Sequence, residues 1–459
     1  MKQKMVRVVR SFLPRPLVRG VESVYRKTRI RLVSGLYGNP ASDLSVIAIT
    51  GTNGKTTTAS YINEILKQAG LKTAMFSTAQ IEIDGQLQAN ELNVTVASVR
   101  RMQQFFKQAK RAKVDYVIIE ATSHALDQHK LDGVPIEAAV MTNLTQDHLD
   151  YHATMEKYAE AKAKLFEMNP KFMILNRDDE WYEYYAKYQP TGQTITYGTD
   201  VDSEARIDYV KLYKKGSEAK VIVDHQTKLD MATALPGKFN VYNMTAAAAT
   251  GYLLGVKVSD IVEGVANLES IPGRFERVVE GLGYDVIVDY AHTPDALEQL
   301  LEAARASTKN RLMLVFGSCG DRDKGKRPIM GGIAARLADR IFLTDEESYN
   351  EDPQAIRDQI REGIDAGKGD SKTEEFPDRR EAIEKALKVA KKGDSILITG
   401  MGHEKYRIVQ GEKIPWNDSE VVRQILDELG RTKPKAAAKS VEKEPSTSSR
   451  DEADDEVAA

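Results

Sequence analysis

The sequence predicts an α/β protein of two units: a P-loop-type central domain with a mainly parallel sheet, and a smaller, doubly wound, Rossmann-like C-terminal domain. Three observations support this. Short apolar runs alternate with helical patterns, a glycine-rich loop stands between one such run and a helical pattern, and a second series of runs begins near Pro272. Strands that alternate with helices pair in parallel, because each helix returns the chain to the edge where the next strand starts.

The first series begins at Ser45, where the run SVIAIT precedes GTNGKTTT and a helical pattern over Ala59–Ala69. The runs at 114–123 and 138–145 predict two further buried strands. Residues 203–235 differ, because short alternating runs such as AKVIVDH favour β-hairpins.

The second series predicts a separate sheet, with a helix over Asp295–Ala306 among its connections. The tail has almost no large apolar residue and is expected to be disordered. The predicted strands are 284–291, 311–318, 339–345 and 394–400, and the predicted segments are 1–44, 45–271, 272–430 and 431–459.

The first forty residues are basic, with Glu22 the only acid. Apolar residues from Val18 to Tyr25 recur at helical spacing. Two interpretations stay open: a short amphipathic helix that docks on the body or touches anionic lipid over 1–40, or a solvated basic arm.

The composition excludes several classes of protein. A net charge of -3 over 459 residues argues against a nucleic-acid binder. A single cysteine, Cys319, allows no internal disulfide and favours a reducing cytoplasm. Neither a transmembrane run nor an apolar signal region is expected. We expect a cytoplasmic monomer.

The loop Gly51-Thr52-Asn53-Gly54-Lys55-Thr56-Thr57 predicts nucleotide binding. Its glycines let backbone N–H groups point at phosphates, and the following helix presents its positive end. Lys55 would neutralise phosphate charge, and Thr56 would hold Mg²⁺. The strict P-loop pattern fails at Ile49, so a plain glycine turn with a chance lysine is the alternative.

Carboxylate and imidazole groups follow the next two strands. Glu120 ends one, and His148 follows the other within DHLDYH. Such groups at successive strand ends suit a Mg²⁺-ATP site. Lys162 and Lys164 lie on a helical pattern beyond them, which is also a plausible solvated face.

Taken in order, these motifs resemble the Mur ligase family, nearest its MurE-type branch that adds the third residue of the stem peptide. The resemblance spans roughly residues 45–425. It rests on GTNGKTTT, EATSHALDQHK, TNLTQDHLDYH, the lysine of YAEAK, PGRFERV, VDYAHTPDALE, FGSCGDRDKGKRP and GMGHE.

The resemblance implies two Mg²⁺ sites. Thr56 and Glu120 would hold the ion on the ATP phosphates, while Glu120 and His148 would help hold a second beside the substrate carboxylate. Lys162 matches the family lysine that CO₂ converts to a carbamate, an oxygen ligand for the second ion. Lys164 is its nearby competitor.

The resemblance also assigns residues to both ends of the substrates. The nucleotide would meet Asn240, Asn243, Arg274, Asp289, Tyr290 and His292 besides the glycine loop. The muramoyl-peptide and amino acid would meet Asn93, Thr95, Ser123, Gln128, Lys130, Arg322, Tyr349, Gly402 and Glu404. Segment 1–44 would be a remnant or replacement of the UDP-binding domain.

One departure concerns the choice of amino acid. Glu346-Glu347-Ser348-Tyr349 stands where the diaminopimelate-adding enzymes carry Asp-Asn-Pro-Arg. We expect two acids to suit a cationic end, such as a lysine ammonium, better than a distal carboxylate.

The expected reaction joins an amino acid to UDP-N-acetylmuramoyl-L-alanyl-D-glutamate through an acyl-phosphate, with release of ADP and phosphate. Two alternatives stay open: another ligase of the same fold, of the folylpolyglutamate or cyanophycin type, and an ATP-binding scaffold without catalysis.

Overall fold

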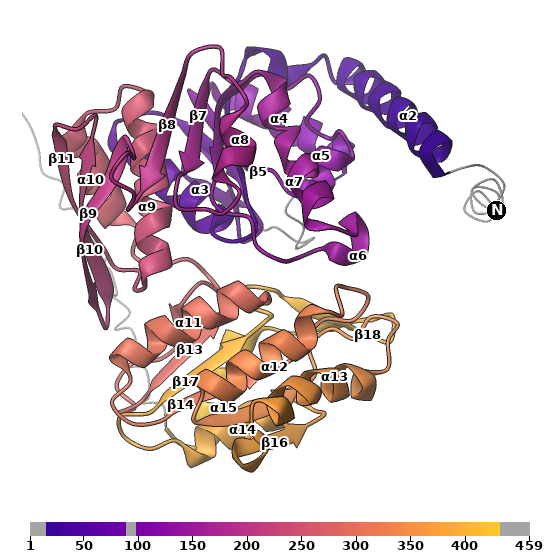
Figure 1. The fold of residues 1–459 in the computed structure, drawn as a ribbon, viewed down its shortest axis with the longest axis vertical. Coiled ribbons are helices and arrows are strands. Elements are labelled where there is room, and N and C mark those ends of the chain that lie inside the picture. Colours follow the sequence, from indigo (N-terminus) through magenta and orange to yellow (C-terminus); the bar gives the residue numbers. More distant parts are fainter. Residues whose placement is uncertain (1–14, 89–97, 432–459) are drawn as a thin grey trace, which may run out of the picture.

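The computed structural model describes residues 15–88 and 98–431, which fold into two lobes, one above the other in Figure 1. The N-terminal lobe runs from β1 (Ser45–Thr50) to α10 (Val258–Asn267), and the C-terminal lobe from β12 (Glu276–Arg277) to α15 (Asp418–Glu428). This arrangement confirms the predicted fold class, with a large, mainly parallel sheet followed by a smaller one.

Within the described residues, the large sheet has eleven strands in the order β11-β10-β9-β8-β7-β6-β1-β5-β2-β3-β4. Neighbours from β9 through β2 are parallel, and both ends continue as antiparallel hairpins. The strands are β1 Ser45–Thr50, β2 Thr73–Phe76, β3 Ile81–Ile83, β4 Gln86–Gln88, β5 Tyr116–Glu120, β6 Ile136–Met141, β7 Phe172–Asn176, β8 Gln193–Gly198, β9 Ala205–Tyr213, β10 Gly216–Val223 and β11 Thr227–Thr233.

Helices cover both faces of the large sheet, because alternate residues of its central strand point to opposite sides. Val46 and Ala48 join a core with α4 and α7, whereas Ile47 and Ile49 join a core with α3, α9 and α10. The lobe's helices, with α2 before it, are α2 Arg15–Leu36, η1 Pro40–Asp43, α3 Lys55–Gln68, α4 Val99–Ala112, α5 Ser123–Asp127, α6 Leu149–His152, α7 Met155–Ala163, η2 Phe166–Met168, α8 Tyr182–Ala186, α9 Lys238–Leu253 and α10 Val258–Asn267.

The C-terminal lobe has a six-stranded sheet in the order β12-β13-β17-β14-β15-β16, parallel except for β12. A separate hairpin, β18–β19, follows it. The strands are β12 Glu276–Arg277, β13 Asp285–Asp289, β14 Leu312–Phe316, β15 Arg340–Thr344, β16 Thr373–Phe376, β17 Ser395–Thr399, β18 Tyr406–Val409 and β19 Glu412–Pro415.

The smaller sheet is also covered on both faces. Helices α11, α12 and α13 share one core with it, and α14 and α15 share the other. The helices are α11 Pro294–Ser307, α12 Lys326–Leu337, α13 Pro353–Ala366, η3 Asp370–Lys372, α14 Arg379–Val389 and α15 Asp418–Glu428.

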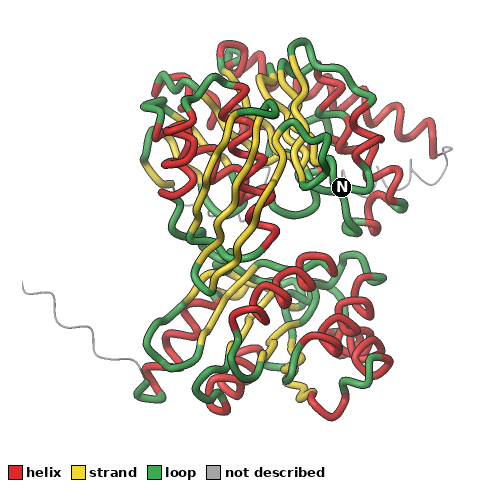
Figure 2. Tube along the Cα trace, turned by 60° about the vertical axis from the view of Figure 1, so that its left-hand side comes forward, coloured by secondary structure: helices red, strands yellow, loops and turns green. Residues whose placement is uncertain are grey.

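The predicted β-hairpins of residues 203–235 are confirmed as β9, β10 and β11. They extend the large sheet down to the C-terminal lobe, as Figure 2 shows. At their tip, Lys214 forms an ion pair with Asp285 at 2.7 Å. The hairpin therefore ties the two lobes on the side away from α6.

The helical pattern near the N-terminus is confirmed as α2, which projects from the body in Figure 1. It touches the lobe where Arg26 lies 3.9 Å from Asp127, and Ile30 is buried. Within residues 15–88 and 98–431, no helix combines the length and the apolar character needed to cross a membrane.

Candidate active site

A cavity of about 1500 Å³ lies between the lobes, lined by residues of both. The carboxyl ends of β1, β5 and β6 open into it from above, and β13 reaches it from below. Most of the predicted site residues line it: Thr52, Asn53, Gly54, Lys55, Thr56, Thr57, Glu120, Lys130, His148, Asn240, Asn243, Arg274, Asp289, Tyr290, His292, Arg322, Tyr349 and Glu404.

The glycine loop, residues 51–57, needs glycine at two points. Gly51 has φ 146° and Gly54 has φ 84°, values that other residues rarely adopt. A Cβ on Gly51 would collide with the Thr142 hydroxyl, and one on Gly54 with the Asn243 side chain. The turn therefore packs against two neighbours and delivers the chain directly into α3, which begins at Lys55.

Two lysine amines converge on one carbonyl of this loop. Lys55 Nζ donates to Gly51 O at 3.0 Å, and Lys162 Nζ donates to the same oxygen at 2.7 Å. Burial, followed by the nearby charge of Lys55, holds the pKa of Lys162 well below its ordinary value. Burial also lowers the pKa of Lys55, opposed by Glu120. Burial therefore favours the neutral amine at Lys162.

Glu120 is anchored on the phosphate side of the cavity. Its Oε1 accepts hydrogen bonds from the Thr56 hydroxyl at 2.9 Å and from the Thr78 N–H at 2.8 Å. The Thr56 hydroxyl also accepts from Arg274 Nη2 of the C-terminal lobe at 3.1 Å. A hydroxyl beside a fixed carboxylate is an oxygen pair of the kind Mg²⁺ prefers, so these residues fit Mg²⁺-ATP.

His148 and Lys162 both lie beside Tyr158. The Lys162 ammonium nitrogen is 4.5 Å from the centre of the Tyr158 ring, and the His148 ring is 6.1 Å from it. Burial lowers the pKa of His148 to about 3, so the imidazole is neutral and able to bind a metal. The described residues contain no group of three or more His, Cys, Asp or Glu side chains suited to a metal.

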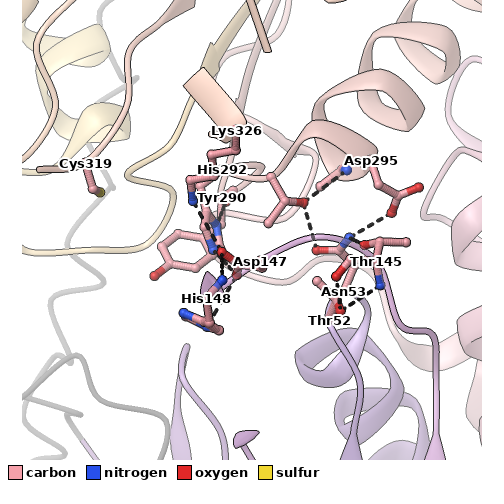
Figure 3. A network of polar contacts seen from close by, with 12 residues as sticks. Thr52, Asn53, Thr145, Asp147, His148, Tyr290, His292, Asp295, Cys319 and Lys326 are labelled. Atoms are coloured by element: carbon pink, nitrogen blue, oxygen red, sulfur yellow. Dashed lines mark hydrogen bonds and ion pairs between the residues drawn. The ribbon is translucent and has the colours of Figure 1, made fainter. Parts of the chain in front are cut away.

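Asp147, directly before His148, connects the two lobes (Figure 3). Its Oδ1 lies 3.4 Å from Lys326 Nζ and its Oδ2 lies 3.8 Å from His292 Nε2, both in the C-terminal lobe. Burial alone would raise the pKa of Asp147, but Lys326, His148 and His292 outweigh it and hold that pKa well below its usual range.

Asn53 makes a further polar connection between the lobes. Its side-chain nitrogen donates to Asp295 at 2.8 Å, and its oxygen accepts from the Thr293 hydroxyl at 3.3 Å. Thr293 is the N-cap of α11, so the glycine loop is held against the start of that helix.

At the nucleotide end, Asn240 and Asn243 sit on the first turns of α9 and bond to each other at 3.2 Å. Asp289 ends β13, where its two oxygens accept backbone N–H groups of Phe275 and Ala291. The aspartate therefore caps its own loop as well as lining the cavity.

The opposite end is acidic, and we call it the acceptor pocket: Tyr290, Arg322, Glu347, Tyr349 and Glu404. Glu347 accepts hydrogen bonds from the Tyr349 hydroxyl at 2.9 Å and the Ile408 N–H at 3.0 Å. Burial, followed by the charge of Glu347, raises the pKa of Glu404 to about 8. The Arg322 guanidinium lies 5.0 Å from the Tyr349 ring centre and is the pocket's cation.

Some predicted residues lie outside the cavity wall. Gly51 of the glycine loop and Lys162, which donates to its carbonyl, do not line the cavity. Ser123 is buried against His152 at 2.9 Å, and Gly402 packs under Tyr290. Gln128, just after α5, does not line the cavity. Asn93 and Thr95 lie outside the described residues.

Sequence reasoning missed Asp147, Lys326 and Thr78 as individual site residues. Asp147 and Lys326 belong to DHLDYH and GDRDKGKRP, so their motifs were a signal. Neither motif shows that the two side chains meet, because 179 positions separate them. Thr78 belongs to no recognised motif, so the sequence contains no signal for its role.

Taken together, a phosphate-binding glycine loop, a fixed carboxylate and an opposing lobe define a nucleotide-dependent α/β enzyme. A family model for the Mur ligase middle domain matches residues 49–251, and one for the Mur ligase glutamate ligase domain matches residues 273–402. The chain belongs to the Mur ligase family and is an ATP-dependent ligase that forms C–N bonds.

Curated relatives agree with this family. The UDP-N-acetylmuramoyl-L-alanyl-D-glutamate–2,6-diaminopimelate ligase of Geobacillus kaustophilus is 40% identical over 413 residues, which is 88% of this chain and 83% of the relative. The Clostridium botulinum enzyme with the same description is 38% identical over 406 residues, 88% of this chain and 82% of its own.

Solved structures place the fold in the same group. A ligase described in the same words has a TM-score of 0.59 and 34% identity, covering 85% of this chain and 79% of its own. The Mycobacterium tuberculosis folylpolyglutamate synthase has a TM-score of 0.69 at 20% identity, covering 81% and 92%. The second likeness concerns the fold alone.

Proposed function

We propose that this chain adds the third amino acid to UDP-N-acetylmuramoyl-L-alanyl-D-glutamate in peptidoglycan synthesis. The observation that carries the proposal is that Lys55, Glu120 and His148 line one cleft, while Lys162 donates to the Gly51 carbonyl of the glycine loop, beside a pocket able to receive an amino acid. Relatives about 40% identical, named for this activity, support it.

The first step joins two negatively charged groups. An oxygen of the substrate carboxylate attacks the γ-phosphorus of ATP, the bond to ADP breaks, and an acyl-phosphate results. Lys55 and Arg274 lower the repulsion from both sides, because they reach the same Thr56 and Glu120 corner from different lobes. Mg²⁺ held by Thr56 and Glu120 would add charge neutralisation there.

In the second step the amine of the amino acid attacks the acyl carbon. Phosphate leaves with the bonding electrons, and an amide remains after a proton is lost. An acyl-phosphate is open to hydrolysis, so the residues that close the lobes together, Asp147 with Lys326 and Asn53 with Asp295, would also exclude water.

We also propose a carbamate on Lys162. Carbamate formation needs a neutral amine as nucleophile, and burial beside Lys55 favours the neutral form at this position. The product would be an anionic oxygen ligand near His148, where a second Mg²⁺ would orient the substrate carboxylate. Lys164 is a poorer candidate, because it is already paired with Asp127 at 2.7 Å.

For the amino acid, we propose a cationic side chain such as that of lysine. Glu347 and Glu404 are buried, and the negative charge of Glu347 disfavours the ionised form of Glu404. An ammonium group between them would relieve this repulsion. Arg322 would take the α-carboxylate. The names of the curated relatives specify diaminopimelate instead, and this chain differs from that group's Asp-Asn-Pro-Arg motif at Glu346–Tyr349.

Other parts of the proposal concern the rest of the chain. Lys130 lines the cavity and would meet the muramoyl-peptide, whereas Ser123 and Gln128 do not line it. We also propose that segments 45–271 and 272–430 are the two domains. The protein is proposed to be a cytoplasmic monomer, with weak contact between residues 1–40 and anionic lipid. The compact turn from Ile271 to Arg274 supports the boundary.

A folylpolyglutamate-type ligase is the second candidate, because such an enzyme shares the fold of this chain. The contacts of Glu120 with Thr56 and of Lys162 with Gly51, both in the glycine loop, argue against a scaffold without catalysis.

A coupled phosphate-release assay tests the function. It supplies ATP, Mg²⁺ and UDP-MurNAc-L-Ala-D-Glu with a panel of amino acids, and uses Lys162→Ala as the negative control. Phosphate release that needs both the nucleotide-peptide and one amino acid is the expected result. Phosphate release with a folate substrate but not with the nucleotide-peptide would overturn the assignment, and so would release without any amino acid.

A further inference from the structure

Asp147 is a buried carboxylate, 4% exposed, whose partners come from both lobes. Its Oδ1 accepts the His148 N–H at 2.9 Å, and His148 itself has a left-handed backbone with φ 55°. From the other lobe come Lys326 and His292 (Figure 3). Burial lowers the pKa of His292 to about 4, so Lys326 is the cation that neutralises Asp147.

Lys326 occupies a costly position for a cation. It is the first residue of α12, where the helix dipole opposes positive charge, and it is only 2% exposed. The charge of Asp147, which belongs to the other lobe, is the largest contribution that offsets these costs, and Glu346, in the same lobe as Lys326, adds a smaller one. If the lobes separated, water would hydrate the two groups instead, so the pair depends on closure.

We infer that Asp147 and Lys326 form a closure-dependent ion pair that positions the acceptor pocket over the His148 loop. This inference rests on the proposed function for its kinetic consequence. Asp147 and Lys326 are positioning residues here, and neither is required to touch the reacting atoms.

The pair reaches the pocket by two short routes. Lys326 begins α12 just after the loop that carries Arg322. His292 Nδ1 lies 2.7 Å from the carbonyl of Tyr290, whose hydroxyl donates to Glu404 at 3.2 Å. Fixing Lys326 and His292 against Asp147 therefore fixes both sides of the pocket relative to the glycine loop.

Neutral variants of similar shape test the pair. Asp147→Asn and Lys326→Gln are each expected to lower kcat about 10- to 100-fold, because reacting groups displaced by about an ångström react far more slowly. The KM for ATP should change less than about threefold, because the glycine loop is intact. The double variant should be no worse than about twofold below the poorer single variant, because both remove one interaction.

Small-angle X-ray scattering measures the compactness of the whole protein, which would not change if Asp147 and Lys326 had only a local structural role. With Mg²⁺ and a non-hydrolysable ATP analogue, the wild-type protein should become more compact, and Asp147→Asn and Lys326→Gln should not. This measurement needs no acceptor substrate, so it remains informative if the proposed reaction fails. Thermal melting of each variant establishes that it is folded.

Lys324→Gln is the matched control. This lysine lies two positions away, is largely exposed, and pairs at 3.0 Å with Glu351 of its own lobe. It should retain wild-type kcat and wild-type compaction. Wild-type kcat in Asp147→Asn, additive losses in the double variant, or normal compaction of both single variants would each overturn the inference.

Discussion

The glycine loop and the acceptor pocket line the same cavity but are assembled differently. The loop is one continuous stretch, residues 51–57, between β1 and α3. The pocket draws its side chains from loops after β13, β14, β15 and β17. Local chain geometry therefore sets the nucleotide end, whereas the amino-acid end depends on how four separate segments meet.

The two regions also differ in charge. Lysines converge on the loop, and burial lowers the pKa of both Lys55 and Lys162. Carboxyl groups converge on the pocket, and burial raises the pKa of both Glu347 and Glu404. Bound phosphates would favour the charged form of Lys55 at one end of the cavity, and a bound ammonium group would favour the charged carboxylates at the other end.

The largest expected effect is at the loop. Lys162→Ala should lower kcat at least about 1,000-fold, because it removes the proposed carbamate ligand and with it the second metal site. Phosphate release measures the rate. Incubation with ¹³C-bicarbonate should give a protein-bound carbamate resonance in the wild type that is missing from the variant.

Lys164→Ala is the control for that experiment. Its pair with Asp127 is partly exposed, so the rate should stay within about threefold of wild type. An active Lys162→Ala protein, or a carbamate signal that survives the substitution, would contradict the metal-ligand role.

Lys55→Met should lower kcat/KM about 100- to 1,000-fold, because one cation opposite the phosphates is lost. The loss should be equal for every amino acid supplied, since the loop does not contact the pocket. Lys67→Met, at the far end of α3, is the control and should keep the wild-type rate. A loss that varied strongly between amino acids would mean that the two regions are not separate.

Glu347→Gln should raise the KM for lysine about tenfold and leave the KM for ATP unchanged, because only the pocket loses a charge. Initial rates with lysine, ornithine and diaminopimelate measure the effect, with the exposed Glu412→Gln as control. A clear preference of the wild-type protein for diaminopimelate over lysine would refute the cationic acceptor.

The smallest effect concerns pH. The pKa of Glu404 is raised from 4.5 to about 8, so the folded protein binds the proton more tightly than the unfolded chain. Its contribution to stability is complete below about 4.5 and is lost as pH rises through about 8. In Glu404→Gln the side chain cannot ionise, so the variant should show no such loss of stability as pH rises.

Thermal melting checks this prediction. Between mildly acidic pH and pH near 8, the Tm of the wild type should fall by about 2–4 °C more than that of Glu404→Gln. Parallel pH profiles for the two proteins would show that Glu404 titrates normally.

Element types were largely predictable, with boundaries less so. The apolar run at Ser45 is a strand, but the helix after the loop begins at Lys55 rather than Ala59. Residues 56–58 are threonines, so the first turn of the helix lacks the apolar periodicity on which the prediction relied. The short strands β3 and β4 and the hairpin β18–β19 were not predicted, because each is only three or four residues long.

The candidate site was predictable where one motif carries one role. Lys55, Thr56 and Glu120 meet as expected, through hydrogen bonds that strand-loop-helix geometry makes natural. Ser123 was expected to face the substrate, but it is buried against His152. Sequence spacing cannot distinguish these outcomes, because the side chain's direction depends on the packing of α5 against α7.

The amino-acid sequence by itself determined the alternation of strands and helices, the glycine loop and the residue types available for chemistry. These follow from local conformational preferences and from periodic burial. Only the tertiary structure decided that Lys55 and Lys162 share the Gly51 carbonyl and that Asp147 meets Lys326 across the lobes. The reason is physical: the strength of a charge interaction depends on distance and burial in space, and separation along the chain specifies neither.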